Sequence, residues 1–154
     1  SGIALNKWLV LVVFLALVIG GGTAIGLVTR PEGWYAALEK PPFNPPNWIF
    51  APVWTILYVL IAVAGWRTFL RDAGGVAMKL WAAQLVLNFL WSPVFFAAHM
   101  VGAALAIVVL MLAAILAFIG ASWTADRPAA WMFVPYAAWV SFATLLNASI
   151  LVLN

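Results

Sequence analysis

The chain has 154 residues, of which 68% are hydrophobic and only 7% are charged, with a formal net charge of +3 and no cysteine. So little polar sequence cannot cover the surface of a water-soluble domain of this length, and the lack of cysteine excludes disulfides and thiolate chemistry. The composition therefore predicts an all-α integral membrane protein, and the small positive charge gives no sign of nucleic-acid binding.

Five apolar runs are long enough to cross a membrane as helices, since about 20 apolar residues span a hydrocarbon core of ~30 Å. We predict that residues 1–154 form one domain, a bundle of five transmembrane helices with a loop at residues 29–49. The predicted helices cover approximately residues 8–28, 50–70, 78–98, 102–123 and 129–153.

The first run, residues 8–28, follows Lys7 and leads to small residues at Gly20, Gly21 and Gly22, as in a secretory signal, but its apolar length exceeds that of a signal core. Arg30-Pro31-Glu32 then marks a membrane exit, so we predict a retained helix. Gly22 and Gly26 form a GxxxG pair on this helix. Such a pair lets another helix approach closely, either within the bundle or from a second copy of the chain.

The segment from residue 29 to residue 49 combines aromatic side chains, asparagines and most of the prolines of the chain. Pro41-Pro42 and Pro45-Pro46 fix φ at their own positions and disfavour helix at the preceding residue, so this segment should be stiff and mostly extended. We expect it to cap a pocket between the helices.

Polar and aromatic side chains recur at helical spacing within the second, third and fifth predicted helices, and each set shares one face. An unpaired amide in hydrocarbon is costly, so we expect these faces to point into the bundle. They serve either as hydrogen-bonding contacts between helices or as the wall of a pocket for a flat, hydrophobic ligand with polar edges, and for the whole set we favour the pocket. The residues are Trp54 and Tyr58; Trp81, Gln84, Asn88, Ser92 and Phe95, with Trp91 alongside; and Tyr136, Trp139, Ala143 and Asn147.

The fourth predicted helix carries a stripe of small residues, for which contact within the bundle and contact between two copies are equally open. Either contact would keep the stripe away from lipid. The stripe consists of Gly102, Ala106, Ala113, Ala117 and Ala121.

Basic residues fall unevenly on the two sides of the predicted bundle. Arg30 and Lys40 flank the side of the 29–49 loop, and all the others flank the side of the N-terminus. Because basic residues concentrate on the cytoplasmic side, we predict a bacterial membrane protein with a cytoplasmic N-terminus and the loop on the opposite face. The residues on the N-terminal side are Lys7, Arg67, Arg71, Lys79 and Arg127.

The sequence offers few groups for catalysis or metal binding. The only histidine, His99, falls at the end of a predicted helix, where an interfacial role is favoured over haem ligation. The four carboxylates all fall in predicted loops, which disfavours a metal cluster, a Ser-His-Asp hydrolase and an ion pump. We therefore predict no metal site and no required cofactor.

Four segments resemble the characteristic stretches of the tryptophan-rich sensory protein and translocator protein (TspO/MBR) family, also called peripheral benzodiazepine receptors. They are WYAALEKPPFNPPNW, VWTILY, AAQLVLNFLWSPVFF and VPYAAWVSFATLLN, and they run in order from about Gly33 to Asn147. The resemblance implies a five-helix bundle, commonly a homodimer, that binds porphyrins, haem-like tetrapyrroles, sterols and isoquinoline-carboxamide ligands in a pocket under the first long loop.

Carried over by motif position, the resemblance implies a ligand site formed by the loop and by the second, third and fifth helices. In some bacterial members, light-dependent porphyrin breakdown is attributed to two tryptophans that match Trp54 and Trp139. A sterol motif of mammalian members lacks its Lys or Arg here, although Val134 and Tyr136 are present. The implied site residues are Trp34, Tyr35, Pro45, Pro46, Trp54, Tyr58, Asn88, Trp91, Ser92, Phe95, Trp139, Ala143, Leu146 and Asn147.

Three classes of function follow from these observations. The favoured one is a membrane receptor or transporter that binds tetrapyrroles as ligands and acts in their metabolism. The alternatives are a light-dependent porphyrin-degrading enzyme that uses Trp54 and Trp139, and a structural or partner-regulating membrane protein.

Overall fold

The computed structural model describes residues 2–29 and 33–154, and all regular structure in these two ranges is helical. Five of the helical runs are long and apolar enough to cross a membrane, which confirms the predicted all-α bundle of an integral multi-pass membrane protein. The spans are Asn6–Val28, Asn47–Asp72, Val76–Ala97, Val101–Ser122 and Arg127–Leu153.

Two of the five spans contain a π-helical turn. The first span runs through α1 (Gly2–Leu15), a π turn η1 (Ala16–Gly20) and α2 (Gly21–Val28). The third span runs through α5 (Val76–Ser92) and a second π turn, η3 (Pro93–Ala97). A π turn inserts one residue into the helical repeat, so the side chains before and after it face different neighbours.

The other spans begin where the local sequence allows a helix to start. The second span starts with a 3-10 turn, η2 (Asn47–Ile49), directly after Pro46, whose ψ of 146° is not helical, and it continues as α4 (Phe50–Asp72). The fifth, α7 (Arg127–Leu153), begins after Asp126 and has a proline in its first turn, where no amide hydrogen is needed. The fourth span is α6 (Val101–Ser122).

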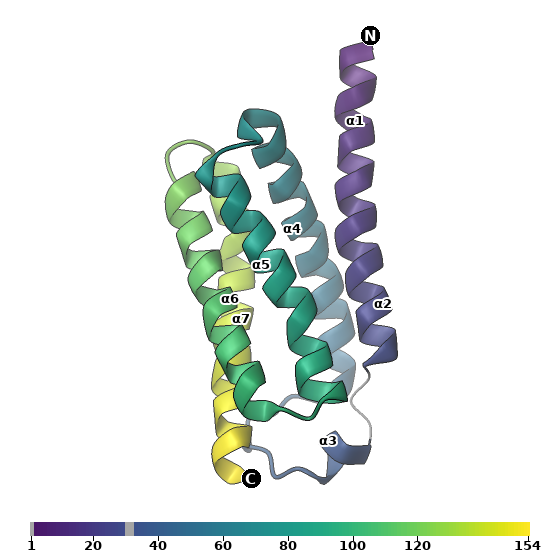
Figure 1. Cartoon of the computed structure of the whole chain (residues 1–154), viewed down its shortest axis with the longest axis vertical. Coiled ribbons are helices and arrows are strands. Elements are labelled where there is room, and N and C mark those ends of the chain that lie inside the picture. Colours follow the sequence, from purple (N-terminus) through teal and green to yellow (C-terminus); the bar gives the residue numbers. More distant parts are fainter. Residues whose placement is uncertain (1, 30–32) are drawn as a thin grey trace.

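The spans run alongside one another, and their connections alternate between the two ends of the bundle (Figure 1). The N-terminus lies at the same end as the α4–α5 turn and the α6–α7 loop. The short helix α3 (Gly33–Ala37), the extended segment after it and the end of α7 lie at the opposite end (Figure 1). We call this second end the loop end.

This arrangement makes a direct topological prediction. The chain has no cysteine, so a thiol introduced at Asn44 or at Ala73 is the only one present. We expect a membrane-impermeant thiol reagent to label Asn44→Cys and Ala73→Cys from opposite sides of sealed vesicles. Labelling of both from the same side would contradict the arrangement.

The bundle core is apolar and closely packed. α6 packs against both α5 and α7, and α1 packs against α4. The rings of Phe118 and Phe133 lie 4.2 Å apart at the α6–α7 contact, and Ile61 and Ile115 are fully buried. Burying each such side chain contributes roughly 1.5–3 kcal/mol in water, and packing supplies the corresponding attraction within lipid.

Glycines allow close contact between α4 and α5 and between α2 and α4. Gly65 of α4 lies against the indole of Trp81, whose Nε1 donates a hydrogen bond to the Ile61 carbonyl at 2.9 Å. Gly22 of α2 lies against the ring of Tyr58, so it serves packing within the bundle. In contrast, the small-residue stripe of α6 is exposed on the outer surface of the bundle.

Polar contacts tie the chain together at both ends. At the N-terminal end, Arg67 forms a bidentate ion pair with Asp126, in which its Nη2 lies 2.8 Å from Oδ1. At the loop end, the Asn154 side chain donates to the Glu39 carbonyl at 2.9 Å and accepts from the Glu39 amide at 3.1 Å. The second pair of contacts fastens the extended segment to the end of α7.

Candidate functional site

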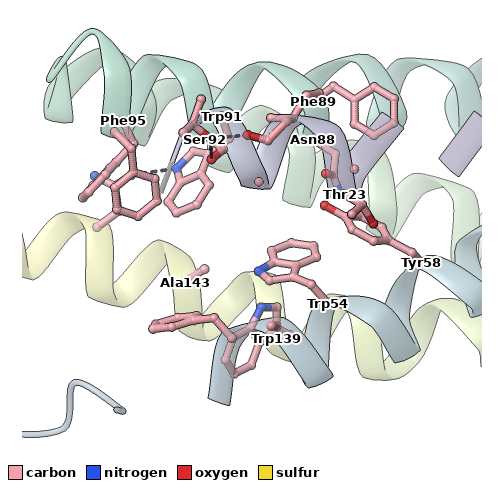
Figure 2. Close-up of a pocket in the computed structure, with 18 of the residues that line it drawn as sticks. Thr23, Trp54, Tyr58, Asn88, Phe89, Trp91, Ser92, Phe95, Trp139 and Ala143 are labelled. Carbon is pink, nitrogen blue, oxygen red and sulfur yellow. Dashed lines mark hydrogen bonds between the residues drawn. The ribbon is translucent and has the colours of Figure 1, made fainter. Parts of the chain in front are cut away.

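A cavity of about 390 Å³ lies in the loop-end half of the bundle, between α2, α4, α5 and α7. Its volume falls within the range of small-molecule sites. Most of its wall is apolar or aromatic, and Figure 2 shows Trp54 and Trp139 on one side facing Trp91 and Phe95 on the other.

Most of the residues implied by the family resemblance lie in the wall of this cavity. α4 contributes two of them, α5 and η3 contribute four, α7 contributes four, and α3 contributes one. They are Tyr35, Trp54, Tyr58, Asn88, Trp91, Ser92, Phe95, Trp139, Ala143, Leu146 and Asn147.

Three of the implied residues lie outside the wall. Trp34 stacks on the His99 ring, with centroids 4.1 Å apart and the planes 8° from parallel, and its edge meets Phe95. Pro45 is half-buried and Pro46 is exposed, and neither lines the cavity. The extended segment crosses the loop end of the bundle, where the Asn154–Glu39 contacts hold it.

The structure also brings in wall residues that the sequence did not single out. Gly22, Thr23, Gly26 and Thr29 form the α2 side of the cavity, and Phe89 joins them from α5. The sequence predicts Gly22 and Gly26 only as a helix-packing pair. Small residues at this spacing are compatible both with close helix packing and with a cavity wall. The sequence alone therefore does not predict that these glycines line a cavity.

A buried hydrogen-bond network lies behind the cavity. Asn88, which lines the cavity, donates from Nδ2 to the Tyr136 hydroxyl at 2.7 Å, and this hydroxyl donates to Gln84 Oε1 at 2.7 Å. Tyr136 and Gln84 are fully buried and do not line the cavity. Asn88 therefore joins the contact between helices to the cavity, and its Oδ1 has no hydrogen-bond partner among the described residues.

A second amide in the wall makes two hydrogen bonds within the protein. Asn147 accepts a hydrogen bond from Trp91 Nε1 at 3.0 Å and donates to the Val101 carbonyl at 3.0 Å. It therefore fixes the orientation of the Trp91 indole and joins α7 to the start of α6. Its role within the protein is structural, because it positions an aromatic surface of the cavity.

Trp139 retains an unused donor. Its Nε1 is buried without a hydrogen-bond partner among the described residues. The Trp54 ring lies nearly perpendicular to the Trp139 ring, at 86°, with centroids 6.5 Å apart. An unpaired buried donor of this kind costs about 1–3 kcal/mol.

The cavity is suited to binding an uncharged aromatic surface. No lysine, arginine, histidine, aspartate or glutamate is among the described residues that line it.

At the loop end, burial raises the pKa of the Tyr35 phenol above its ordinary value, an effect that its hydrogen bond to Asn44 Oδ1 at 3.1 Å partly offsets. The Tyr35 hydroxyl is therefore neutral at physiological pH and acts as a donor.

Comparisons with known proteins find strong similarity over nearly the whole chain. The model of the TspO/MBR family matches residues 12–153. A tryptophan-rich sensory protein of Cereibacter sphaeroides is 39% identical over 147 residues, which cover 96% of this chain and 92% of the relative.

Two further relatives show how widely this similarity extends. The tryptophan-rich protein TspO of Chlorobaculum tepidum is 39% identical over 91% of this chain and 95% of its own length. The translocator protein of Bos taurus is 38% identical, with coverages of 91% and 87%. The similarity thus includes both bacterial and mammalian proteins.

Proposed function

Because the chain belongs to the TspO/MBR family, we propose that it binds porphyrins and haem-like tetrapyrroles in the cavity between α2, α4, α5 and α7, and that it serves a sensory or translocator role in the membrane. The names of its relatives, sensory protein and translocator protein, support the role. Sterols and isoquinoline-carboxamide ligands are further candidates for the same cavity.

The observation that carries the proposal is the composition of the cavity wall. Trp54, Trp91 and Trp139 offer flat surfaces for stacking, and Asn88 Oδ1 has no hydrogen-bond partner among the described residues. Aromatic stacking contributes about 0.5–1.5 kcal/mol per pair beyond burial, so several such surfaces can hold a large ring system.

No charged side chain is among the described residues that line the cavity, and this constrains how a tetrapyrrole is oriented. An isolated ionised carboxylate is costly to bury, so carboxylate side chains of a porphyrin should lie toward an opening of the cavity. The ring system would then occupy the aromatic interior.

A matched pair of α7 variants tests the proposal. Ala143 lines the cavity, whereas Ala138 of the same helix is exposed outside it. We expect Ala143→Leu to weaken protoporphyrin IX binding by about tenfold, or ~1.4 kcal/mol, because the added side chain fills ligand space without removing a hydrogen bond. Ala138→Leu should bind as the unsubstituted protein does, with binding measured in the dark by tryptophan quenching.

This titration in the dark, followed by illumination, separates the three classes of function. Binding without a photoproduct supports a receptor or transporter. No quenching by the unsubstituted protein, or equal affinity of the two variants, would contradict binding in this cavity and leave a structural or partner-regulating role.

The adjacent indoles of Trp54 and Trp139 favour a second candidate, a porphyrin-degrading activity in light. Both line the cavity, and an indole can donate an electron to a photoexcited porphyrin. Illumination of the bound complex should then give a new absorbance. Loss of that absorbance in Trp54→Phe together with Trp139→Phe would support this candidate, and full retention would contradict it.

We also propose that the protein forms a homodimer. The small-residue stripe of α6 is exposed in the single bundle, and such stripes allow close helix contact within membranes.

A further inference from the structure

The residues that line the cavity differ in how exposed they are on different helices. All of its described wall residues from α5, η3, α6 and α7 are buried or half-buried. Its exposed wall residues all come from α2 or from the beginning of the second span. They are Thr23, Gly26, Leu27, Asn47, Ala51 and Thr55. The cavity therefore opens along the seam between α2 and α4.

The π turn in the first span explains why this seam is open. α1 and η1 pack against α4, whereas after the turn α2 packs against α5. Gly21 of α2 lies against the Phe89 ring, and the hydroxyls of Thr29 and Ser92 are 2.6 Å apart. The contact between Gly22 and Tyr58 closes the upper end of the seam, and below it α2 follows α5 away from α4.

The seam reaches into the hydrocarbon layer. Thr23 lies five residues before the end of α2 and Thr55 five residues after the start of α4, which places each about 8 Å from that end of its helix at 1.5 Å per residue. The Thr55 hydroxyl donates to the Ala51 carbonyl of its own helix at 2.8 Å, so it needs no water at this depth. The α4 edge of the seam is therefore compatible with lipid.

We propose that the seam between α2 and α4 is a lateral portal through which ligands pass between the hydrocarbon core of the membrane and the cavity. The ligand aspect of this inference rests on the proposed binding function. The portal selects molecules that first dissolve in the membrane, enter with their flat apolar part leading and keep polar groups toward the membrane surface.

Two glycines on the first span provide a matched test of the portal. An added Cβ at Gly26 or at Gly20 meets no atom within 4 Å, so a side chain can be introduced at either position without a clash at its Cβ. Gly26 lines the mouth of the cavity, whereas Gly20 does not. Gly26→Trp should obstruct the portal, and Gly20→Trp is the control for an added indole.

The first readout requires no tetrapyrrole. Ala143→Cys places the only thiol of the chain in the cavity wall, where a bilayer-dissolved pyrene maleimide can report access. We expect Gly26→Trp to slow labelling by about tenfold and Gly20→Trp to leave the rate unchanged, since only the former blocks the route. Equal labelling rates in the two variants would overturn the portal.

The opposite wall provides an independent pair of variants. Thr55→Trp adds bulk at the mouth from α4, and Ile56→Trp adds the same bulk on the neighbouring exposed residue, which does not line the cavity. If ligands use the portal, labelling of Ala143→Cys should be slow in the Thr55→Trp variant and unchanged in the Ile56→Trp variant. Slow labelling in both would show a general effect of added indoles and would overturn it.

The second readout uses protoporphyrin IX in nanodiscs. Obstruction of a route changes rates more than equilibrium, so Gly26→Trp should slow both association and dissociation by about fivefold while changing affinity less. Unchanged exchange rates would overturn the portal as the ligand route. If the unsubstituted protein binds no porphyrin, the proposed function fails, while the labelling rates still decide whether the portal exists.

Discussion

Replacing Gly65 by valine should destabilise the bundle by about 3–4 kcal/mol. A side chain at this position would overlap the Cε2, Cζ2 and Nε1 atoms of the Trp81 indole, which is buried between α4 and α5 and also contacts Phe14 of the first span. Moving the indole would break its hydrogen bond to the Ile61 carbonyl. The loss therefore combines overpacking with an unpaired indole donor.

Unfolding by denaturant in detergent micelles measures this effect. Gly120→Val is the matched control, because Gly120 lies on α6 with no atom within 4 Å of an added Cβ. Its free energy of unfolding should change by less than about 1 kcal/mol. A further change of Trp81 to leucine in the Gly65→Val protein should restore part of the stability by removing the overlap. Equal stability of the two valine variants would show that the α4–α5 contact can relax.

Replacing Tyr136 by phenylalanine should have the next largest effect, about 2–4 kcal/mol, because it deprives two buried amides of their partner. The Tyr136 hydroxyl accepts from Asn88 and donates to Gln84, and all three residues are buried. Gln84 Nε2 already lacks a partner among the described residues, so Gln84 would have no side-chain hydrogen bond left among them.

Two comparisons identify the network as the cause. Tyr58→Phe removes a hydroxyl with no hydrogen bond among the described residues, so its stability should change little. Adding Gln84→Leu to Tyr136→Phe should recover stability, because an apolar pair replaces an unpaired amide. If Tyr136→Phe and Tyr58→Phe unfold at the same denaturant concentration, the network does not stabilise the bundle.

Helical spacing was sufficient to predict which faces of the third and fifth spans point inward. The pattern around Asn88 and the pattern around Tyr136 were assigned separately, and the structure joins them by a hydrogen bond. Hydropathy likewise predicted the five spans, because a membrane imposes the length of an apolar run. The helix starts differ by a few residues where local features decide, as at Asn47 after Pro46.

Features that depend on distant residues could not be predicted in this way. The prolines of residues 29–49 predict stiffness, but the position of the segment is set by Asn154, which lies 115 residues from Glu39 along the chain. The α2 wall of the cavity depends on the π turn at Ala16–Gly20, for which the Leu, Val and Ile side chains around it give no distinct pattern. Pro45 and Pro46 consequently lie farther from the cavity than the motif position implied.

The dependence of the cavity on α7 has a consequence for the order of assembly during synthesis. The fifth span is translated after the other four, yet it supplies Trp139, Asn147, the Tyr136 hydroxyl and the Asn154 contacts to Glu39. Until it inserts, the nascent bundle holds Asn88 and Gln84 without this partner in hydrocarbon, and the extended segment is not yet fastened. We therefore expect the incomplete bundle to be least stable in the interval between insertion of α6 and insertion of α7.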